Sequence, residues 1–355
     1  MKKTLALLLC AAMALSCLAG CVGRGGSASS SEGGSSAGSS SSSAASSTSG
    51  STSQPDPAVL PKLMVMSGPT GVGAAKLMAD HDAREGTPVV ESASVVADNQ
   101  HINNALINKD ADIAAIATNA AAALYAKTNG LVQVMAVNTL GVLYILEKGD
   151  SVSSLADLRG KTVYATGQGA NPEYVLNHLL KENDVDPADV DIQWMTAQEV
   201  TAKMATGESG ICMLPVPAAT ALMIKDSGVR QAISLSEAWD RLDVGALPQG
   251  CIVVRTAFLQ EHPEAVANFL TAYEASISYM KDEANRDQAA ELVAQYGITP
   301  NAAIARQAIP QCNLTFLQGE EMRDTLEEYY RVLFQADPAA IGGSMPYDSF
   351  YYQAG

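Results

Sequence analysis

Short apolar runs alternate with helix-like segments along most of the chain, from residue 61 onward. The strand-like runs of a first series are 62–66, 87–96, 112–118 and 131–138, and its helix-like segments are 72–81, 99–108 and 119–127. Strand, helix and strand in succession are the pattern of a mostly parallel sheet that is covered by helices. We therefore expect an α/β fold.

A second series with the same pattern follows, and the end of the chain reads as almost wholly helical. Strand-like runs at 155–166, 190–195, 210–215 and 231–235 alternate with helix-like segments at 171–182, 197–206 and 217–226. A further strand within 248–259 precedes helices that begin at residue 263 and have no strands of their own. These helices are expected to pack on the first sheet. One lobe is then discontinuous, 61–139 with 249–355, and encloses a second lobe, 140–248.

Two passages of the chain between the lobes, near 138–142 and 245–250, predict a hinge with a ligand cleft. In open α/β sheets the loops at the carboxyl ends of the strands line such a crevice. The candidate ligand-binding residues on these loops are Ser67, Gly68, Pro69, Thr70, Gly71, Thr118, Asn119, Asn138, Thr139, Thr166, Gly167, Gly169, Ala170, Asn171 and Pro215. None of them is charged, which argues against a multiply charged ligand.

Gly68 and Gly73 have the spacing of a phosphate-binding P-loop, but the residues that carry its chemistry are missing. The pattern requires Lys and then Ser or Thr after the second Gly, and this chain has Ala74 and Ala75. Lys76 comes two residues late, about 200° further round a helix of 3.6 residues per turn. A strand, a small-residue turn and a helix N-terminus remain, and they suit a small solute better than a nucleotide.

The N-terminus has the features of an export signal: Lys2 and Lys3, then an apolar run, then small residues. "LAGC", 18–21, resembles the bacterial lipoprotein cleavage site. This resemblance implies that residues 1–20 are removed and that Cys21 is lipidated. Alternatives are Cys17 as the lipidated residue, an ordinary secretory signal, or an uncleaved anchor. The Ser/Gly-rich segment 21–60 cannot form a core, so we expect a disordered tether that holds an extracytoplasmic protein on the cell membrane by its lipid alone.

Charge and cysteine content exclude several classes of function. The net charge is −16, and removal of residues 1–20 takes away two Lys and no acid, −16 − 2 = −18. Nucleic acid is therefore not an expected partner. Cys212, Cys251 and Cys312 are expected to be buried free thiols, with a Cys212–Cys251 disulfide as the alternative. The four His residues are scattered and no C-x-x-C occurs, so neither a metal site nor a cofactor is expected.

Several stretches resemble the substrate-binding lipoproteins of bacterial ABC importers, in the branch of nitrate, sulfonate, taurine and thiamine-pyrimidine binders. They are "DLRGKTVYATGQGANPEY" (157–174), "CIVVRTAFLQEHPEAVANFLTAYEASISYM" (251–280), "AAELVAQYGI" (289–298) and "GGSMPYDSFYY" (342–352). The resemblance implies a two-lobed periplasmic-binding-protein-like fold of type II. It also implies a monomer that captures a sulfonate- or taurine-like anion or a thiamine-pyrimidine-like heterocycle and delivers it to permease subunits with a cytoplasmic ATPase.

One departure from these relatives concerns a turn of the second lobe. Relatives often have an acid between two prolines there, whereas this chain has Val216 between Pro215 and Pro217. The predicted loops offer hydroxyls without a nearby His or Lys, which argues against an enzyme. An exported enzyme on the same fold and a surface lipoprotein that binds a partner protein remain the alternatives.

The anchor can be tested at Cys21. The substitution Cys21→Ser should release the protein from the membrane without unfolding it, because only the lipidated thiol is removed. Intact-mass analysis of the N-terminal peptide should find the added diacylglyceryl group in the natural protein. A membrane-bound natural protein without this added mass would contradict the prediction.

Overall fold

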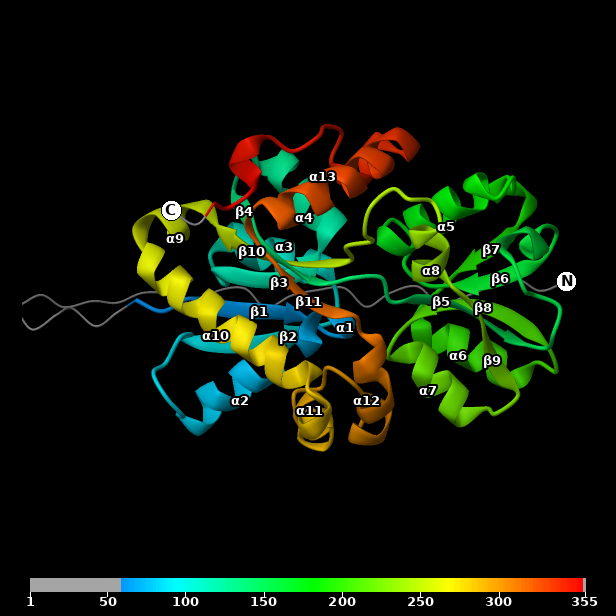
Figure 1. Cartoon of the computed structure of the whole chain (residues 1–355), viewed down its shortest axis with the longest axis horizontal. Coiled ribbons are helices and arrows are strands. Elements are labelled where there is room, and N and C mark those ends of the chain that lie inside the picture. The colour runs from blue at the N-terminus through cyan, green and yellow to red at the C-terminus, as the bar shows by residue number, and fades with distance from the viewer. Residues whose placement is uncertain (1–58, 354–355) are drawn as a thin grey trace, which may run out of the picture. The chain divides into compact units, whose positions relative to one another are not determined.

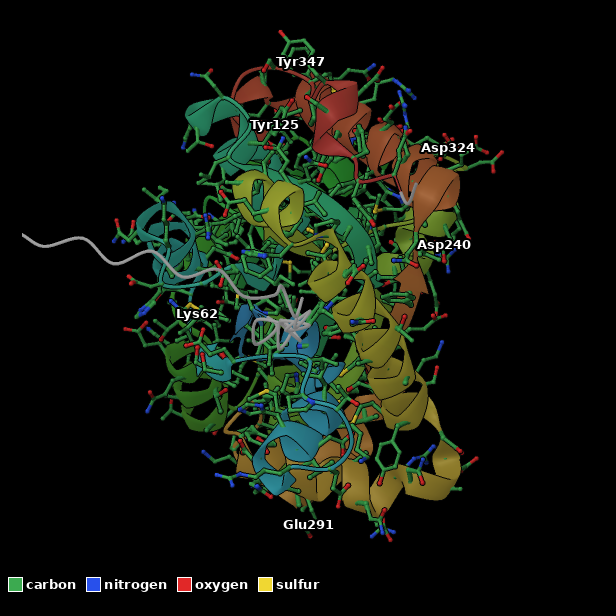
Figure 2. All side chains as sticks on the ribbon, turned by 90° about the vertical axis from the view of Figure 1, so that its left-hand side faces the viewer. Lys62, Tyr125, Asp240, Glu291, Asp324 and Tyr347 are labelled. Atoms are coloured by element: carbon green, nitrogen blue, oxygen red, sulfur yellow. The ribbon has the colours of Figure 1, made fainter. Side chains whose placement is uncertain are left out.

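The computed structural model describes residues 59–353, which all lie within one compact unit, Pro55–Gly355. The predicted signal peptide, 1–20, and all of the predicted tether except residues 59 and 60 lie outside the described residues, and so does Cys21. The described chain contains two sheets, each flanked by helices (Figure 1). Figure 2 shows exposed carboxylates such as Asp240, Glu291 and Asp324 pointing outward from this body.

The first sheet has six strands in the order β11-β4-β10-β3-β1-β2. Their bounds are β1 Lys62–Met66, β2 Ser92–Val96, β3 Ile113–Ala117, β4 Val132–Thr139, β10 Gly250–Arg255 and β11 Leu314–Leu317. Strands β1, β2 and β3 are parallel, while β10 pairs antiparallel with β3 and β4, and β11 antiparallel with β4. Four of the six strands thus run in one direction, and the sheet is mixed.

Helices cover both faces of this sheet because its strands are apolar on both sides. Leu63 and Val65 pack on one face with α2, α10 and α11, whereas Met64 packs on the other with α3, α4 and α13 (Figure 1). Such burial on both faces is typical of α/β sheets. The helices of this lobe are α1 Pro69–Val72, α2 Ala75–Ala83, α3 Asn99–Asn108, α4 Thr118–Thr128, α9 Thr256–Glu261, α10 Pro263–Lys281, α11 Arg286–Gln295, α12 Ala302–Ala308 and α13 Gly319–Ala336.

The second sheet has five strands in the order β7-β6-β8-β5-β9. Their bounds are β5 Leu143–Lys148, β6 Thr162–Ala165, β7 Asp191–Trp194, β8 Gly210–Pro215 and β9 Val229–Ser234. Only β5 runs opposite to the other four strands. Helices α5 Asn171–Glu182 and α8 Leu235–Asp240 cover one face, and α6 Ala197–Thr206 and α7 Ala218–Lys225 cover the other.

Four expectations about secondary structure are wrong. The strand-like run 155–166 begins with a 3₁₀ helix, Leu155–Leu158, and only Thr162–Ala165 forms a strand, β6. The second series was expected to begin at residue 155, but β5 precedes it and pairs with both β8 and β9. The chain after residue 263 was expected to contain no strand, but β11 pairs with β4 at the edge of the first sheet. The helix expected over 72–81 is divided into α1 and α2, with Gly73 and Ala74 between them. Gly73 lies there against Ile277 and Tyr273 of α10, where a Cβ would approach Ile277 Cγ1 to 2.8 Å.

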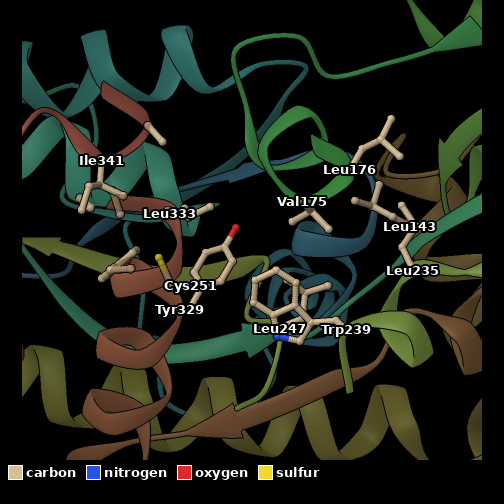
Figure 3. Packing of buried hydrophobic residues seen from close by; sticks show 14 of the residues in the cluster. Leu143, Val175, Leu176, Leu235, Trp239, Leu247, Cys251, Tyr329, Leu333 and Ile341 are labelled. Atoms are coloured by element: carbon tan, nitrogen blue, oxygen red, sulfur yellow. The ribbon is translucent and has the colours of Figure 1, made fainter. Parts of the chain in front are cut away.

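Apolar packing continues from one sheet to the other. Figure 3 shows Tyr329 of α13 near Leu247 and Trp239, and the rings of Tyr329 and Trp239 lie 5.7 Å apart. Cys251 belongs to the same cluster, and Cys212 and Cys312 are buried elsewhere in the core. The prediction of three buried free thiols is confirmed.

Glu147 on β5 offers a test of stability because its buried carboxylate accepts several hydrogen bonds. Burial alone raises the pKa of Glu147, but hydrogen bonds from Ser151 and Val152, together with Arg230, outweigh it and lower the pKa below its ordinary value. Because the pKa of Glu147 is lower in the folded protein than in the unfolded chain, the ionised carboxylate stabilises the fold at pH values above the unfolded pKa of about 4.3. This stabilisation is lost as the pH falls below that value and through the folded-state pKa.

Glu147→Gln should therefore lower the free energy of unfolding by about 1–3 kcal/mol at neutral pH. The difference from the natural protein should shrink as the pH falls below about 4.3. Urea denaturation at a series of pH values measures both effects. A difference that stays constant down to acid pH would contradict the assigned role of the carboxylate.

Candidate functional site

The predicted binding residues lie at the carboxyl ends of strands β1, β3, β4, β6 and β8, but not all of them are in loops. Asn138 and Thr139 end β4, Pro215 ends β8, and Thr118 and Asn119 begin α4. The structure brings many of these residues into contact through two groups of buried hydrogen bonds. The first group joins Thr118 to Asn171, and the second joins Thr70 to Asn138 and Thr139. The groups meet at residues 249 and 250, where β10 begins.

Asn171 connects the two lobes. It is the first residue of α5, and Ala170 is the N-cap. The Asn171 side chain contacts the first lobe. Its Nδ2 donates to Thr118 Oγ1 at 3.1 Å and to the carbonyl of Gln249 at 3.2 Å, and its Oδ1 accepts from the Tyr329 hydroxyl at 2.9 Å. The Asn171 side chain therefore has partners for both its donor and its acceptor.

Thr118 lies at the centre of the same group. Its hydroxyl donates to the carbonyl of Pro248 at 2.8 Å, and its own carbonyl accepts from the Tyr330 hydroxyl at 2.9 Å. Burial raises the pKa of both Tyr329 and Tyr330, so the two phenols stay protonated and act as donors. Thr118 is fully buried, and a solute could not touch its hydroxyl without a movement of the lobes.

Asn138 organises the second group within the first lobe. Its Nδ2 donates to the carbonyl of Thr70 at 2.9 Å and to the Tyr273 hydroxyl at 2.9 Å, and its Oδ1 accepts from Thr139 Oγ1 at 3.2 Å. Gly250 fits closely against it, since a Cβ there would lie 2.7 Å from Asn138 Oδ1 and 2.9 Å from Thr70 Oγ1. This group holds the ends of β1, β4 and β10 together.

Several backbone amides of the predicted loops already have acceptors. Ser67 N donates to the carbonyl of Val96 at 2.7 Å, Gly68 N to that of Ile298 at 3.2 Å, and Gly71 N to that of Gly68 at 3.1 Å. Gly68 also has a φ of 87°, which only Gly adopts readily. The turn around Ser67, Gly68, Pro69 and Gly71 therefore contributes to the fold through these contacts.

The loop before α5 has a similar internal contact. Gly169 N donates to the carboxylate of Glu173 at 2.6 Å. Gly167 has a φ of 92° and packs on Pro172, while Thr166 and Ala170 are half-buried. The Glu173 carboxylate is thus the acceptor for the backbone amide of this loop. Gly169 itself is exposed.

Pro215 ends β8, which is the parallel neighbour of β6 in the second sheet. It pairs with Leu143 at the end of β8, and the following Val216 is fully buried and donates its N–H to the carbonyl of Val142 at 3.0 Å. The apolar Val216, where relatives often carry an acid, is therefore part of the core.

A groove of about 350 Å³ contains three of the predicted residues, namely Asn119, Gly169 and Ala170. Helices α3 and α4 of the first lobe form most of its lining, and Tyr174 of α5 lines it from the second lobe. The remaining residues of the lining are Asn99, Gln100, Asn103, Ile107, Ala120, Ala123, Leu124, Lys127, Thr128, Ala339 and Ala340. The volume lies within the range of small-molecule sites, about 300–1,000 Å³.

A larger groove, about 790 Å³, lies between α2 and α10 and contains none of the predicted residues. Its charged side chains include Lys76, which pairs with Asp80 and lies over the Tyr279 ring. Lys76 is thus engaged on its own helix. We regard the groove at Asn119 as the better candidate because both lobes contribute to it.

Sequence reasoning did not identify Tyr273, Tyr329, Tyr330 or Gln249 as parts of the site region. The three tyrosines lie on long helices with a buried face, so the pattern shows only core positions. Nothing local marks their hydroxyls as partners of loop residues.

Within residues 59–353, no cluster of His, Cys, Asp and Glu could hold a metal ion. No helix in the same range is long and apolar enough to cross a membrane.

A family model described as "NMT1/THI5 like" matches residues 85–289, which is more than half of the 355-residue chain. The chain therefore belongs to the NMT1/THI5-like family. No curated protein matches the chain.

Solved structures support the fold. An ABC transporter protein from Parabacteroides distasonis is 23% identical with a TM-score of 0.68, covering 83% of this chain and 99% of its own. The periplasmic aliphatic sulphonate binding protein SsuA from Escherichia coli is 14% identical with a TM-score of 0.67, covering 84% and 92%. A Candida albicans gene product, described as having the generic periplasmic binding protein fold, is 15% identical with a TM-score of 0.51, covering 82% and 93%. The fold is thus the two-lobed α/β fold of periplasmic binding proteins, as the sequence predicted.

The contact between the lobes can be tested at Tyr329. Tyr329→Phe removes the donor to Asn171 Oδ1 and leaves a buried acceptor unpaired, so the free energy of unfolding should fall by about 1–3 kcal/mol. Tyr347→Phe is the matched control, because Tyr347 is 74% exposed (Figure 2). Urea denaturation measures both variants, and equal stability of the two would contradict the role of the hydroxyl.

Proposed function

We propose that this protein is the solute-binding component of an ABC importer. It captures a small organic solute between two lobes, 61–139 with 249–355 and 140–248, and delivers it to permease subunits. The observation that carries the proposal is the groove at Asn119, to which α3 and α4 contribute from one lobe and Tyr174 from the other. Membership of the NMT1/THI5-like family supports it.

The relatives indicate the kind of solute. The Escherichia coli protein binds aliphatic sulphonates according to its description, and the Parabacteroides distasonis protein is described as an ABC transporter. By analogy with the Escherichia coli protein the ligand is a sulfonate- or taurine-like anion. The sequence resemblance described above adds a thiamine-pyrimidine-like heterocycle as the alternative. The residues that the sequence predicted for binding remain the candidates for its contacts. A movement of the lobes would free Thr118 and Asn171, whereas Asn138 is bonded to Thr70 and Tyr273 within the first lobe.

Thiol chemistry is a poor alternative. Burial raises the pKa of Cys212 and of Cys312 to about 12, and it also raises the pKa of Cys251. A reactive cysteine needs a thiolate near neutral pH and access to its substrate. These buried thiols are therefore not candidates for a nucleophile.

The proposed place of action is the outer side of the cell membrane. Lipidated Cys21 and the Ser/Gly-rich segment 21–60 would act as anchor and tether. The protein would act as a monomer, and its only direct attachment to the membrane would be the lipid. The ATPase that drives import would lie on the cytoplasmic side.

Ligand-induced stabilisation and compaction test the proposal. Aliphatic sulfonates, taurine and hydroxymethylpyrimidines should be screened by thermal unfolding, since a ligand at 100 times its dissociation constant adds about 2.7 kcal/mol. A stabilising solute should also reduce the radius of gyration in small-angle scattering, because closure of the lobes is a hinge motion.

Ala120→Phe, which fills the groove, should abolish this stabilisation. Ala202→Phe on α6 is the matched control, because it makes the same change at an exposed helical alanine outside the groove. Stabilisation that survives Ala120→Phe in a folded protein would place the ligand elsewhere. A complete lack of stabilising solutes would contradict the proposed function.

A further inference from the structure

Asn119 carries a buried acceptor that has no hydrogen-bond partner. Its side chain is only 5% exposed, and its Nδ2 donates to the carbonyl of Ala340 at 3.4 Å. Because Nδ2 is the atom that faces this carbonyl, Oδ1 is the other end of the Asn119 side-chain amide. Within the described residues, no group donates a hydrogen bond to this Oδ1. A buried acceptor left unpaired costs about 1–3 kcal/mol. Either an ordered water molecule or a solute can supply the donor that this oxygen lacks.

Asn119 is one of the residues that line the groove of about 350 Å³ between α3 and α4. Asn103 of α3 lines the same groove, and its Oδ1 is also buried and without a partner. Ile107, at 49% exposure, adds apolar surface to the lining together with Ala123 and Leu124. The lining therefore combines apolar side chains with polar ones, and two of its asparagines carry buried acceptors that lack donors.

The residues that line the groove favour a neutral donor over a cationic one, and the carboxylates of Glu173 and Asp337 lie beside Tyr174 at its edge. No Asp or Glu is among the residues that line it, and Lys127 is the one lysine among them. Asn119 is the second residue of the 11-residue helix α4, whose N-terminus carries a partial positive charge. An ammonium group would lose its hydration there without gaining a carboxylate. A sulfonate would bring only acceptors to an oxygen that needs a donor.

We propose that the groove binds a neutral small molecule through an N–H or O–H group that donates to Asn119 Oδ1. Carboxamides, hydroxyl compounds and neutral amino-heterocycles belong to this class. The apolar body of the ligand lies against Ile107, Ala123 and Leu124. This inference rests on the proposed solute-binding function and narrows the ligand class to molecules with a neutral donor.

A panel of small probes tests this preference. Phenyl, cyclohexyl and propyl groups each carry a carboxamide, a sulfonate or an aminomethyl group, so that only the head group changes within each set. Binding to the full-length chain is measured by ligand-observed NMR titration up to about 10 mM, near the weak limit for fragments. At least one carboxamide should bind roughly tenfold more tightly than its matched sulfonate and amine, which corresponds to about 1.4 kcal/mol.

Two variants connect the preference to Asn119. Asn119→Leu should weaken carboxamide binding roughly tenfold, whereas Asn108→Leu, at an exposed position on the neighbouring helix α3, should not. Asn119→Asp keeps the shape of the side chain but adds a negative charge. This variant should shift the preference from the carboxamide to the aminomethyl probe, which a purely structural role for Asn119 would not cause.

The outcomes separate this inference from the proposed function. Sulfonates that bind more tightly than their carboxamides, and lose binding in Ala120→Phe, would overturn the neutral-donor inference while the solute-binding function stands. An unchanged carboxamide affinity in a folded Asn119→Leu protein would also overturn it. If no carboxamide saturates the protein up to about 10 mM, the inference fails as well.

Discussion

Strand β10 (Gly250–Arg255) holds the parts of this fold together, because it returns the chain from the second sheet into the middle of the first. It pairs antiparallel with β3 and β4, and its first residue fits against Asn138 and Thr70 with no room for a side chain. Immediately before it, the carbonyl of Gln249 accepts from Thr118 N and from Asn171 Nδ2. One short segment thus joins the ends of β3 and β4 to the start of α5, and the geometry of the interlobe region depends on it.

The parts of the fold that have local signals were predictable from the sequence. Helices α3, α5 and α6 begin and end where the sequence predicted, and α6 starts with a capping box formed by Thr196 and Glu199. Strands β5 and β11 were missed for different reasons. β5 follows β4 after three residues and was not separated from it, while β11 has only four residues between helical segments. Their existence depends on pairing with strands far away in the sequence, which no local pattern contains.

In the candidate site, too, some features follow from the local sequence and others depend on contacts between residues far apart in the chain. The loops at the strand ends were predictable, because the alternation of strands and helices determines where they lie. Their hydrogen-bond partners were not. Asn171 accepts from Tyr329, 158 residues away, and Asn138 donates to Tyr273, 135 residues away. A neutral Asn on a loop is equally compatible with a ligand contact and with a contact inside the protein, and only the folded chain distinguishes them.

This distinction also bears on how a ligand could control the lobes. Hydrogen bonds of Asn171 and Thr118, and the contact between Trp239 and Tyr329, already stabilise the arrangement seen in the structure. A ligand shifts such an equilibrium only by the difference in its affinity for the two states. Asn119 differs from the satisfied residues because its acceptor is buried and unpaired in this arrangement. The satisfied polar groups therefore hold the lobes in the arrangement seen here, and a ligand that changes this arrangement must outweigh their contacts.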